Sequence, residues 1–219
     1  MPLDTLANIR TEVRSLLNEA TAGLFSDAQI DEWLGQVSLD ISVKTHCVET
    51  TGTVTLVQGT VEYALPTTFA NPAITDTEAR VIKIYGAYLS NVGFLRVRPQ
   101  VWGRKQPVTQ TVPTWYTQWG QRIFVQPPPS GAGTLSLLVS VNSDTVTDLP
   151  MSYRHLLIPG AVSRAKLRDR KYAEAAQLYA EYTNSIMYQR TDLQERGTDT
   201  QADQNIPDRA ERTVVAAGG

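Results

Sequence analysis

The chain has 219 residues, 42% of them apolar and 19% charged, and a formal net charge of −2. This length suits one large domain or two small ones, and the composition is that of an ordinary globular protein. The near-neutral charge disfavours a free-standing nucleic-acid binder, which is usually clearly basic. No apolar run reaches the ~20 residues of a membrane span. The start, MPLDTLANIR, does not predict a signal peptide, and the single cysteine favours a reducing compartment.

The first 50 residues predict two helices. The apolar face of the first recurs at steps of three and four, and consists of Leu3, Leu6, Ile9, Val13, Leu16 and Leu17. The second has a clear start, because Ser26 can cap it and Gln29 completes a capping box. Phe25 and Ile30 stand where a hydrophobic staple requires them. The buried stripe predicted for this helix is Ile30, Trp33, Leu34, Val37 and Ile41.

From about residue 51 the apolar pattern alternates, which predicts strands. A first hairpin is expected around Gln58-Gly59, because glycine supplies the positive φ of a tight turn. A second is expected around Asn91 and Gly93, and a third around Trp119-Gly120. The run TLSLLVSV closes the series. Residues 51–149 therefore predict a β-rich segment, either a small sandwich or a curled sheet.

The stretch QPPPSGAG separates two of these strands and has two interpretations. A polyproline ligand would require an exposed, extended segment. A hairpin loop is favoured, because the stretch lies between strand-like runs and contains glycines.

Helical periodicity returns near Pro150, which fits a first helical turn. Pro159-Gly160 predicts a break or a kink. The clearest helix follows, and its predicted apolar face is Tyr172, Ala175, Ala176, Tyr179, Tyr182 and Ile186. The polar residues 191–219 cannot bury enough surface to offset their ordering entropy, so they predict an extended or disordered tail.

The predicted fold class is α+β. Helices from the two ends, residues 3–48 and 150–190, are expected to form a helical bundle, with residues 51–149 as a β-rich insertion. Together they would make a single domain over residues 1–190, followed by the extended C-terminal tail.

No catalytic, metal or cofactor site is predicted, and the chain is not expected to be an enzyme. His46-Cys47 lacks the further ligands that zinc requires. Ser152 and His155 are close in sequence, but no nucleophile elbow accompanies them. Four tryptophans are interpreted as packing groups rather than stacking platforms.

One basic cluster is a candidate surface. It consists of Arg164, Lys166, Arg168, Arg170 and Lys171. Cations at a helix C-terminus are one interpretation. Contact with DNA or with an acidic partner surface is the other.

The order of these elements resembles the head-to-tail adaptor, or connector, proteins of tailed bacteriophages. LFSDAQIDEWLGQVSLDIS is similar to the second helix of that family, with Gly35 where asparagine is more usual. VQGTVEYALP resembles its first hairpin, and VPTWYTQWGQRIFVQPPPSGAGTLSLLVSV resembles its later strands. LPMSYRHLLIPGAVSRAKLRDRKYAEAAQLYAEY resembles its closing helices. The resemblance covers about residues 3–190, and it identifies the proline-rich stretch with a hairpin between two strands.

The resemblance implies a structural protein of the virion neck, assembled in the host cytoplasm. It implies a ring of about twelve copies beneath the portal protein, with a downstream tail or nozzle protein on the other side. Genomic DNA would pass as cargo, and no membrane is involved. Adaptor C-termini are expected to reach along the portal or a neighbouring subunit, which makes Ile206, Val214 and Val215 the predicted anchors.

Two other classes of protein remain as alternatives. The Trp- and Tyr-rich β segment would suit a carbohydrate-binding or other β-rich module of a phage tail protein. A small hydrolase with an unrecognised site is the second alternative.

Overall fold

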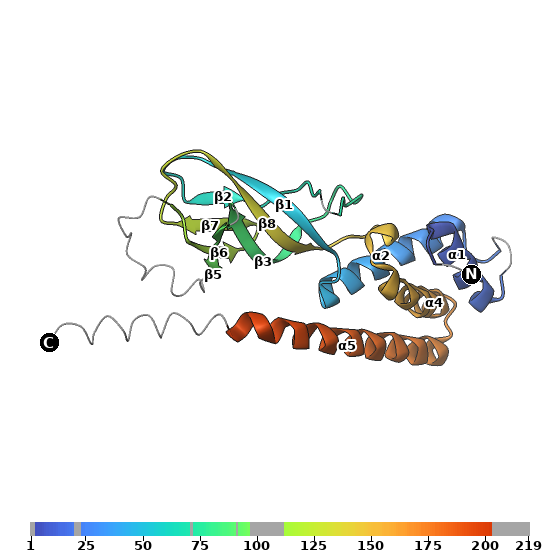
Figure 1. Ribbon diagram of the computed structural model, residues 1–219. Coiled ribbons are helices and arrows are strands. Elements are labelled where there is room, and N and C mark those ends of the chain that lie inside the picture. Colours follow the sequence, from blue (N-terminus) through green and yellow to red (C-terminus); the bar gives the residue numbers. More distant parts are fainter. Residues whose placement is uncertain (1–2, 20–22, 71, 91, 97–111, 203–219) are drawn as a thin grey trace.

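The computed structural model describes residues 3–19, 23–70, 72–90, 92–96 and 112–202. The fold is α+β, and a helical part and a β part lie at opposite ends of an elongated molecule (Figure 1). The helical part contains α1 (Leu6–Leu17), α2 (Asp27–Thr45), α4 (Leu157–Arg168) and α5 (Tyr172–Ala202), with the short 3-10 helices η1 (Val146–Asp148) and η2 (Met151–Leu156) before α4.

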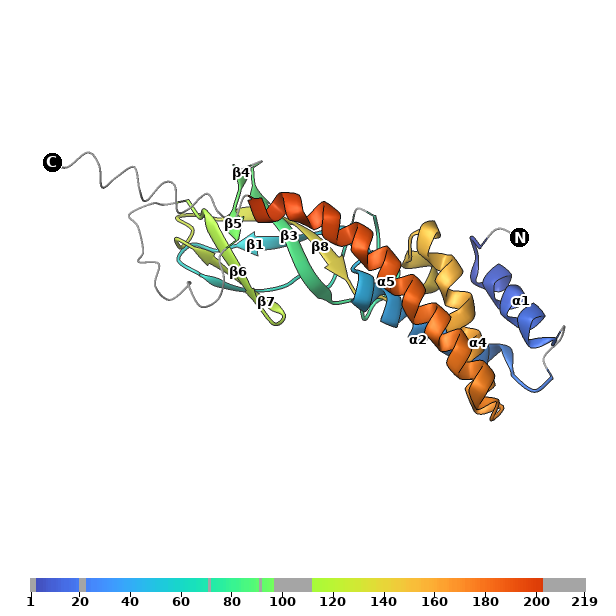
Figure 2. The same cartoon turned by 90° about the horizontal axis from the view of Figure 1, so that it is seen from below.

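Helix α4 is the centre of the helical part. It packs against α1, α2 and α5, and Figure 2 shows α1 and α5 on opposite sides of it. Gly160 of α4 permits a close approach to α2, because a Cβ at this position would lie only 2.6 Å from Cγ1 of Val37. Helices from the two ends of the chain therefore share one apolar core.

Arg154 connects the start of the chain to η1 and η2. Its side chain is buried, and its guanidinium donates hydrogen bonds to four backbone carbonyl oxygens. Two belong to Leu3 and Asp4, at 3.2 and 2.8 Å. The others belong to Thr147 and Leu149, at 2.8 and 2.9 Å. One side chain therefore satisfies carbonyls from segments about 150 residues apart in sequence.

The capping box predicted at the start of α2 is confirmed. Ser26 Oγ accepts a hydrogen bond from the backbone N–H of Gln29, and Gln29 Oε1 accepts one from the backbone N–H of Ser26. Phe25 and Ile30 are both buried, as the staple requires, and the Phe25 ring meets Trp33 edge to face at 5.1 Å.

Substituting Ser26 with alanine is expected to lower the free energy of unfolding by about 1 kcal/mol, because the N–H of Gln29 loses its acceptor. The measurement is the shift in urea midpoint. Ser15→Ala, at an exposed position within α1, is the control and should leave the midpoint nearly unchanged. An unchanged midpoint for Ser26→Ala would argue against the stabilising role of the cap.

Within the described ranges the β part has eight strands. They are β1 (Glu49–Leu56), β2 (Glu62–Ala64), β3 (Val81–Leu89), β4 (Val92–Gly93), β5 (Leu95–Arg96), β6 (Trp115–Trp119), β7 (Arg122–Gln126) and β8 (Gly133–Val141). They form two four-stranded sheets with the orders β1-β8-β3-β4 and β2-β7-β6-β5, and only the β5–β6 pair is parallel. Buried aliphatic and aromatic side chains from both sheets belong to one core.

The chain leaves the helical part through β1 and returns through β8, and these two strands are neighbours. Their register runs from Glu49 opposite Ser140 to Leu56 opposite Gly133. Alternate residues of both strands are buried, which follows from the period of two in the sequence. The β part is therefore inserted into the helical part through a single pair of long strands (Figure 1).

The first predicted hairpin is wrong in its pairing, and the second is confirmed over a shorter length than predicted. Gly59 does adopt the expected positive φ of 74°, but β1 pairs with β8 whereas β2 pairs with β7 in the other sheet. In the second hairpin β3 does pair antiparallel with the short β4, with Leu89 opposite Val92, and the N–H of Phe94 donates to the carbonyl of Ala87. The pairing ends there, because β5 joins β6 in the other sheet.

The third hairpin, β6–β7 around Gly120, is confirmed. The proline-rich stretch is also a connection between strands, but it joins β7 to β8 of the opposite sheet and is not a hairpin loop. Its Pro129 carbonyl accepts a hydrogen bond from the N–H of Gly59 at 2.9 Å, so the two crossings support each other.

The predicted break at Pro159-Gly160 is wrong. Pro159 is the third residue of α4, where its missing N–H would be unpaired in any case. The change of helix type lies just before it, where η2 ends and α4 begins.

Helix α5 differs from its prediction in two respects. Ala175, Tyr182 and Ile186 are buried as expected, but Tyr172 and Tyr179 are 63% and 53% exposed because only one side of α5 faces α2 and α4. The helix also continues to Ala202, so the predicted start of the tail at residue 191 lies within it.

Candidate assembly surfaces

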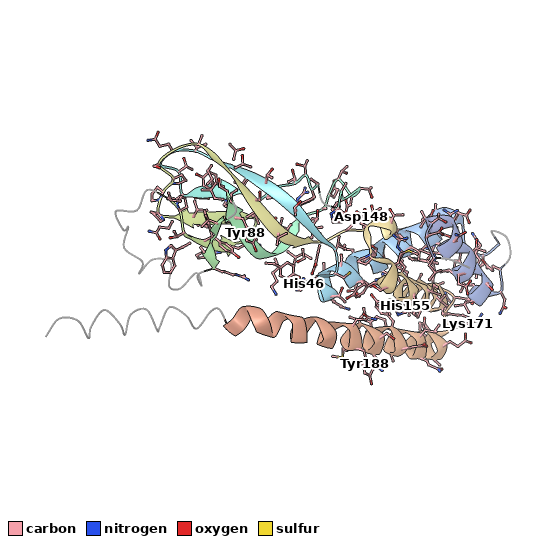
Figure 3. The ribbon with its side chains drawn as sticks, viewed as in Figure 1. His46, Tyr88, Asp148, His155, Lys171 and Tyr188 are labelled. Atoms are coloured by element: carbon pink, nitrogen blue, oxygen red, sulfur yellow. The ribbon has the colours of Figure 1, made fainter. Side chains whose placement is uncertain are left out.

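The five predicted cations lie close together in the chain, three in the second half of α4 and two in the turn before α5. Two of them are paired with acids. Lys166 Nζ lies 2.8 Å from Glu174 Oε2, and this hydrogen bond lowers the pKa of Glu174. Lys171 Nζ lies 2.6 Å from Asp169, which raises the pKa of Lys171. Both contacts lie at the α4–α5 turn, where Figure 3 places Lys171, so these two lysines have a structural role.

Fewer of the five cations are available to a partner than the sequence predicts. Arg164 donates to the side chain of Gln36 on α2 at 2.6 Å, so it connects helices. Arg168 and Arg170 are exposed, and no described residue forms an ion pair with either. They are the part of the cluster that remains available to an acidic surface.

Helix α5 presents an exposed surface of large side chains, of which only Tyr172 and Tyr179 were placed on the apolar face from the sequence. Tyr172, Tyr179, Met187 and Tyr188 are each more than half exposed. The first three follow one side of the helix, and Tyr188 points away from α2 and α4 (Figure 3). Exposed aromatic side chains concentrated on one helix indicate a contact surface.

Helix α5 is attached to the helical part by Tyr182. Its hydroxyl donates to Asp40 Oδ2 of α2 at 2.7 Å, and Lys44 reaches the same oxygen at 2.8 Å. Burial raises the pKa of Tyr182 far above its ordinary value, so this hydroxyl remains a donor. This contact holds the exposed side of α5 at a fixed orientation.

A polar network at the junction holds the β part in place, and sequence reasoning missed it. Asp148 accepts hydrogen bonds from the backbone and hydroxyl of Thr75, the backbone of Asp76 and the hydroxyl of Ser143. Ser42 Oγ in turn accepts from the N–H of Ser143 at 3.1 Å. The end of β8 is thus bound both to the loop before β3 and to α2 (Figure 3).

Two arginines of α1 bind aspartates of α2 and so connect the two helices. Arg10 contacts both carboxylate oxygens of Asp31, with Nε to Oδ1 at 2.8 Å, and Arg14 Nε donates to Asp27 at 3.1 Å. The hydrogen bond from Arg14 is the main reason that the pKa of Asp27 lies below its ordinary value of 3.8. The hydrogen bond to Asp31 likewise raises the pKa of Arg10.

The ion pair between Asp27 and Arg14 predicts that the stability of the fold depends on pH. A carboxyl with a lowered folded-state pKa stabilises the fold at neutral pH, and this contribution is lost as pH falls through the folded-state pKa. We expect wild type to be more stable than Asp27→Asn at pH 7. The difference should shrink below ~pH 4, where the wild-type carboxyl becomes protonated.

A series of urea midpoints from pH 7 to pH 2 measures this difference. Glu32→Asn is the matched control, because Glu32 is an exposed acid on the same helix with no ion pair to any described residue. A wild-type advantage over Asp27→Asn that stays constant with pH would contradict the prediction.

An open groove of about 480 Å³ lies between the end of α2 and the β part. It is lined by aliphatic, amide and arginine groups, including Val43, Arg80 and Arg96. Gln121 in its wall donates to the carbonyl of Val81 at 2.9 Å, so it covers part of the open edge of β3. Among the described residues that line the groove, none is a nucleophile or an acid.

The residues considered for catalysis or metal binding do not form a site. Cys47 is buried, and burial raises its pKa to about 11, so it is a weak nucleophile at neutral pH. Ser152 and His155 are exposed on η2. In the described part of the chain, no group of three or more His, Cys, Asp or Glu side chains could hold a metal ion. No helix in the same ranges is both long and apolar enough to cross a membrane.

Two further groups of residues were considered from the sequence, the predicted C-terminal anchors and the tryptophans. Ile206, Val214 and Val215 lie outside the described residues, as does Trp102. Of the other tryptophans, Trp33 is buried as predicted, but Trp119 is 72% exposed at the tip of the β6–β7 hairpin. Trp119 is the last residue of β6 and stands opposite Arg122, beside the turn.

The fold and these surfaces define an α+β protein whose distinctive features are exposed aromatic and charged faces on a rigid helical part. Such faces are typical of proteins that work through contacts with other proteins. The family model of the SU10 adaptor protein matches residues 4–207, so the chain belongs to this family of phage adaptor proteins. It is therefore a structural component of a bacteriophage virion and belongs to the head-tail adaptors. None of the curated protein sequences is significantly similar to the chain.

Proposed function

We propose that the chain forms a ring of about twelve copies beneath the portal of a tailed phage. The ring links the portal to a downstream tail or nozzle protein and lines the channel through which genomic DNA leaves. The observation that carries the proposal is the family match over residues 4–207, which covers both the helical part and the β part.

The shape of the molecule supports a bridging function. The helical part and the β part lie at opposite ends, so one chain offers two different surfaces to two different neighbours (Figure 1). The paired strands β1 and β8 and the Asp148 network hold the two parts together. A rigid connection of this kind transmits position from one partner to the other.

The charge of the chain suits a channel wall. The net charge of −2 lets DNA slide, because tight binding requires many cationic contacts to phosphate. Arg168 and Arg170 are then proposed to face an acidic group on a neighbouring protein surface, and DNA is passing cargo.

We also propose that Ile206, Val214 and Val215 anchor the C-terminus to the portal or to a neighbouring subunit. Helix α5 carries the chain past the helical part and alongside the β part as far as Ala202 (Figures 1 and 2). The following 17 residues have a reach of up to roughly 56 Å when extended.

The test is addition of the purified chain to DNA-filled heads that carry a portal but no tail. We expect electron microscopy to show a ring on the portal with the rotational symmetry of the portal. Absence of binding would contradict the proposed function. A chain lacking residues 203–219 should keep its thermal midpoint but occupy fewer portals. Full occupancy and DNA retention by this variant would show that the C-terminal residues are passive.

A further inference from the structure

Part of the exposed surface of α5, without Tyr188, forms one continuous stripe. Tyr172, Ala176, Tyr179, Thr183 and Met187 follow each other at steps of three and four, which places them on one side of a helix. Tyr172, Tyr179 and Met187 are 63%, 53% and 68% exposed. Burying large apolar side chains of this kind contributes about 1.5–3 kcal/mol each, so the stripe is a strong candidate for burial by a partner.

A complementary surface lies on α1 of the same chain. Ala7, Thr11 and Ser15 recur every four residues along its exposed side, so their small side chains form a shallow row. Large aromatic side chains pack well against such a row, because adjacent backbones approach closely there. Helices α1 and α5 lie on opposite sides of α4, so the row and the stripe cannot meet within one chain (Figure 2).

The directions of α1, α4 and α5 determine which of their ends lie at the same end of the helical part. Arg154 holds the start of α1 near η2, which precedes α4, and α5 runs back along α4 (Figure 2). The end of α1 and the start of α5 therefore lie at the same end of the helical part. In a second copy with the same orientation, the row on α1 would run alongside the stripe on α5.

The charges beside the two surfaces are opposite. Arg168 and Arg170 stand next to the start of the stripe, and Glu12 stands beside the row on α1. None of these three forms an ion pair with any described residue. Unlike charges on two surfaces of one chain favour contact between copies and select one orientation.

We infer that the α5 stripe of one copy binds the exposed side of α1 of a second copy. Tyr172 and Tyr179 pack against the small row, and Arg168 and Arg170 approach Glu12. The contact joins two different surfaces, so it repeats around a closed ring without a two-fold axis. This inference rests on the proposed ring and identifies the surfaces that meet in it.

Cross-linking between full-length copies tests the contact. A Thr11→Cys chain is mixed with a Tyr179→Cys chain and treated with a short bismaleimide, so that any product must join two copies. Cys47 does not compete, because it is buried and its pKa is raised to about 11. We expect cross-linked pairs, and ladders of higher species when both cysteines are in one chain.

The matched control is Tyr188→Cys mixed with Thr11→Cys. Tyr188 is 80% exposed on the same helix but lies off the stripe, so this mixture should give only background. A Thr11–Tyr179 yield no higher than this control, measured at the highest soluble concentration, would overturn the inference.

Charge substitution gives an independent readout. Tyr179→Glu should weaken self-association by roughly tenfold or more in sedimentation velocity, and Tyr188→Glu should change it much less. Circular dichroism confirms that both variants are folded. Equal effects of the two variants would overturn the inference.

The same variants distinguish this inference from the proposed function. If Tyr179→Glu forms rings on tailless heads as wild type does, the interface is wrong and the adaptor ring stands. If the Thr11→Cys and Tyr179→Cys chains cross-link as expected but no chain binds heads, the interface stands and the proposed position beneath the portal is wrong.

Discussion

Replacing Arg154 with alanine is expected to lower the free energy of unfolding by about 3–5 kcal/mol. The guanidinium satisfies carbonyls of Leu3, Asp4, Thr147 and Leu149, and hydrogen bonds to a charged donor are among the strongest in proteins. Their loss leaves these carbonyls without a donor and releases the start of α1 from η2. For a chain of this length we expect the thermal midpoint to fall by roughly 10 °C, measured by calorimetry.

Two further variants show whether the loss comes from the geometry of the guanidinium. Arg154→Lys keeps the charge but has one nitrogen, which cannot reach carbonyls on both sides, so most of the loss should remain. Arg168→Ala removes an exposed arginine of the same helical part and should change stability by less than about 0.5 kcal/mol. Wild-type stability in Arg154→Lys would contradict the role assigned to the four carbonyl contacts.

The features that the sequence predicted correctly are local. The capping box of Ser26 and Gln29 involves residues three apart, and the β6–β7 turn at Gly120 joins strands that are adjacent in sequence. The resemblance to phage adaptor proteins depended on the order of several such local patterns, and the family match confirms it.

The features that sequence reasoning missed depend on distant partners. Alternation identifies a strand and its buried side, but it does not say that Leu56 pairs with Gly133 of β8 rather than with the next strand. Arg154 likewise gave no signal, because its partners at residues 3 and 4 are backbone atoms that any residue possesses.

The candidate surfaces also combine features that are evident in the sequence with features that depend on distant partners. The five cations of the basic cluster are evident in the sequence, but the pairing of Lys166 with Glu174 and of Lys171 with Asp169 required the geometry of the turn. Apolar character alone suggested burial for Tyr172 and Tyr179, whereas their exposure follows from the direction in which α5 packs on α4.

A chain that ends at Leu149 is expected to lose the ordered structure of α1 and α2. Truncation removes α4 and α5, against which the apolar sides of α1 and α2 pack. Ile9, Val13 and Val37 are at most 1% exposed, and returning three such side chains to water costs about 5–9 kcal/mol. That is comparable to the whole stability of a typical domain, so the remaining Arg10–Asp31 and Arg14–Asp27 contacts cannot hold the pair together.

The measurements are far-UV circular dichroism and amide hydrogen exchange of the 1–149 fragment. Helical signal should be lost, while β1 and β8 keep their exchange protection because their mutual pairing and the core between the sheets remain. A fragment of residues 46–149 is the matched control and should show the same protected strands. A soluble 1–149 fragment with a helical spectrum and one cooperative transition would contradict the proposal that residues 1–190 form a single domain. It would show instead that the N-terminal helices require only the β part, through contacts such as Ser42 with Ser143.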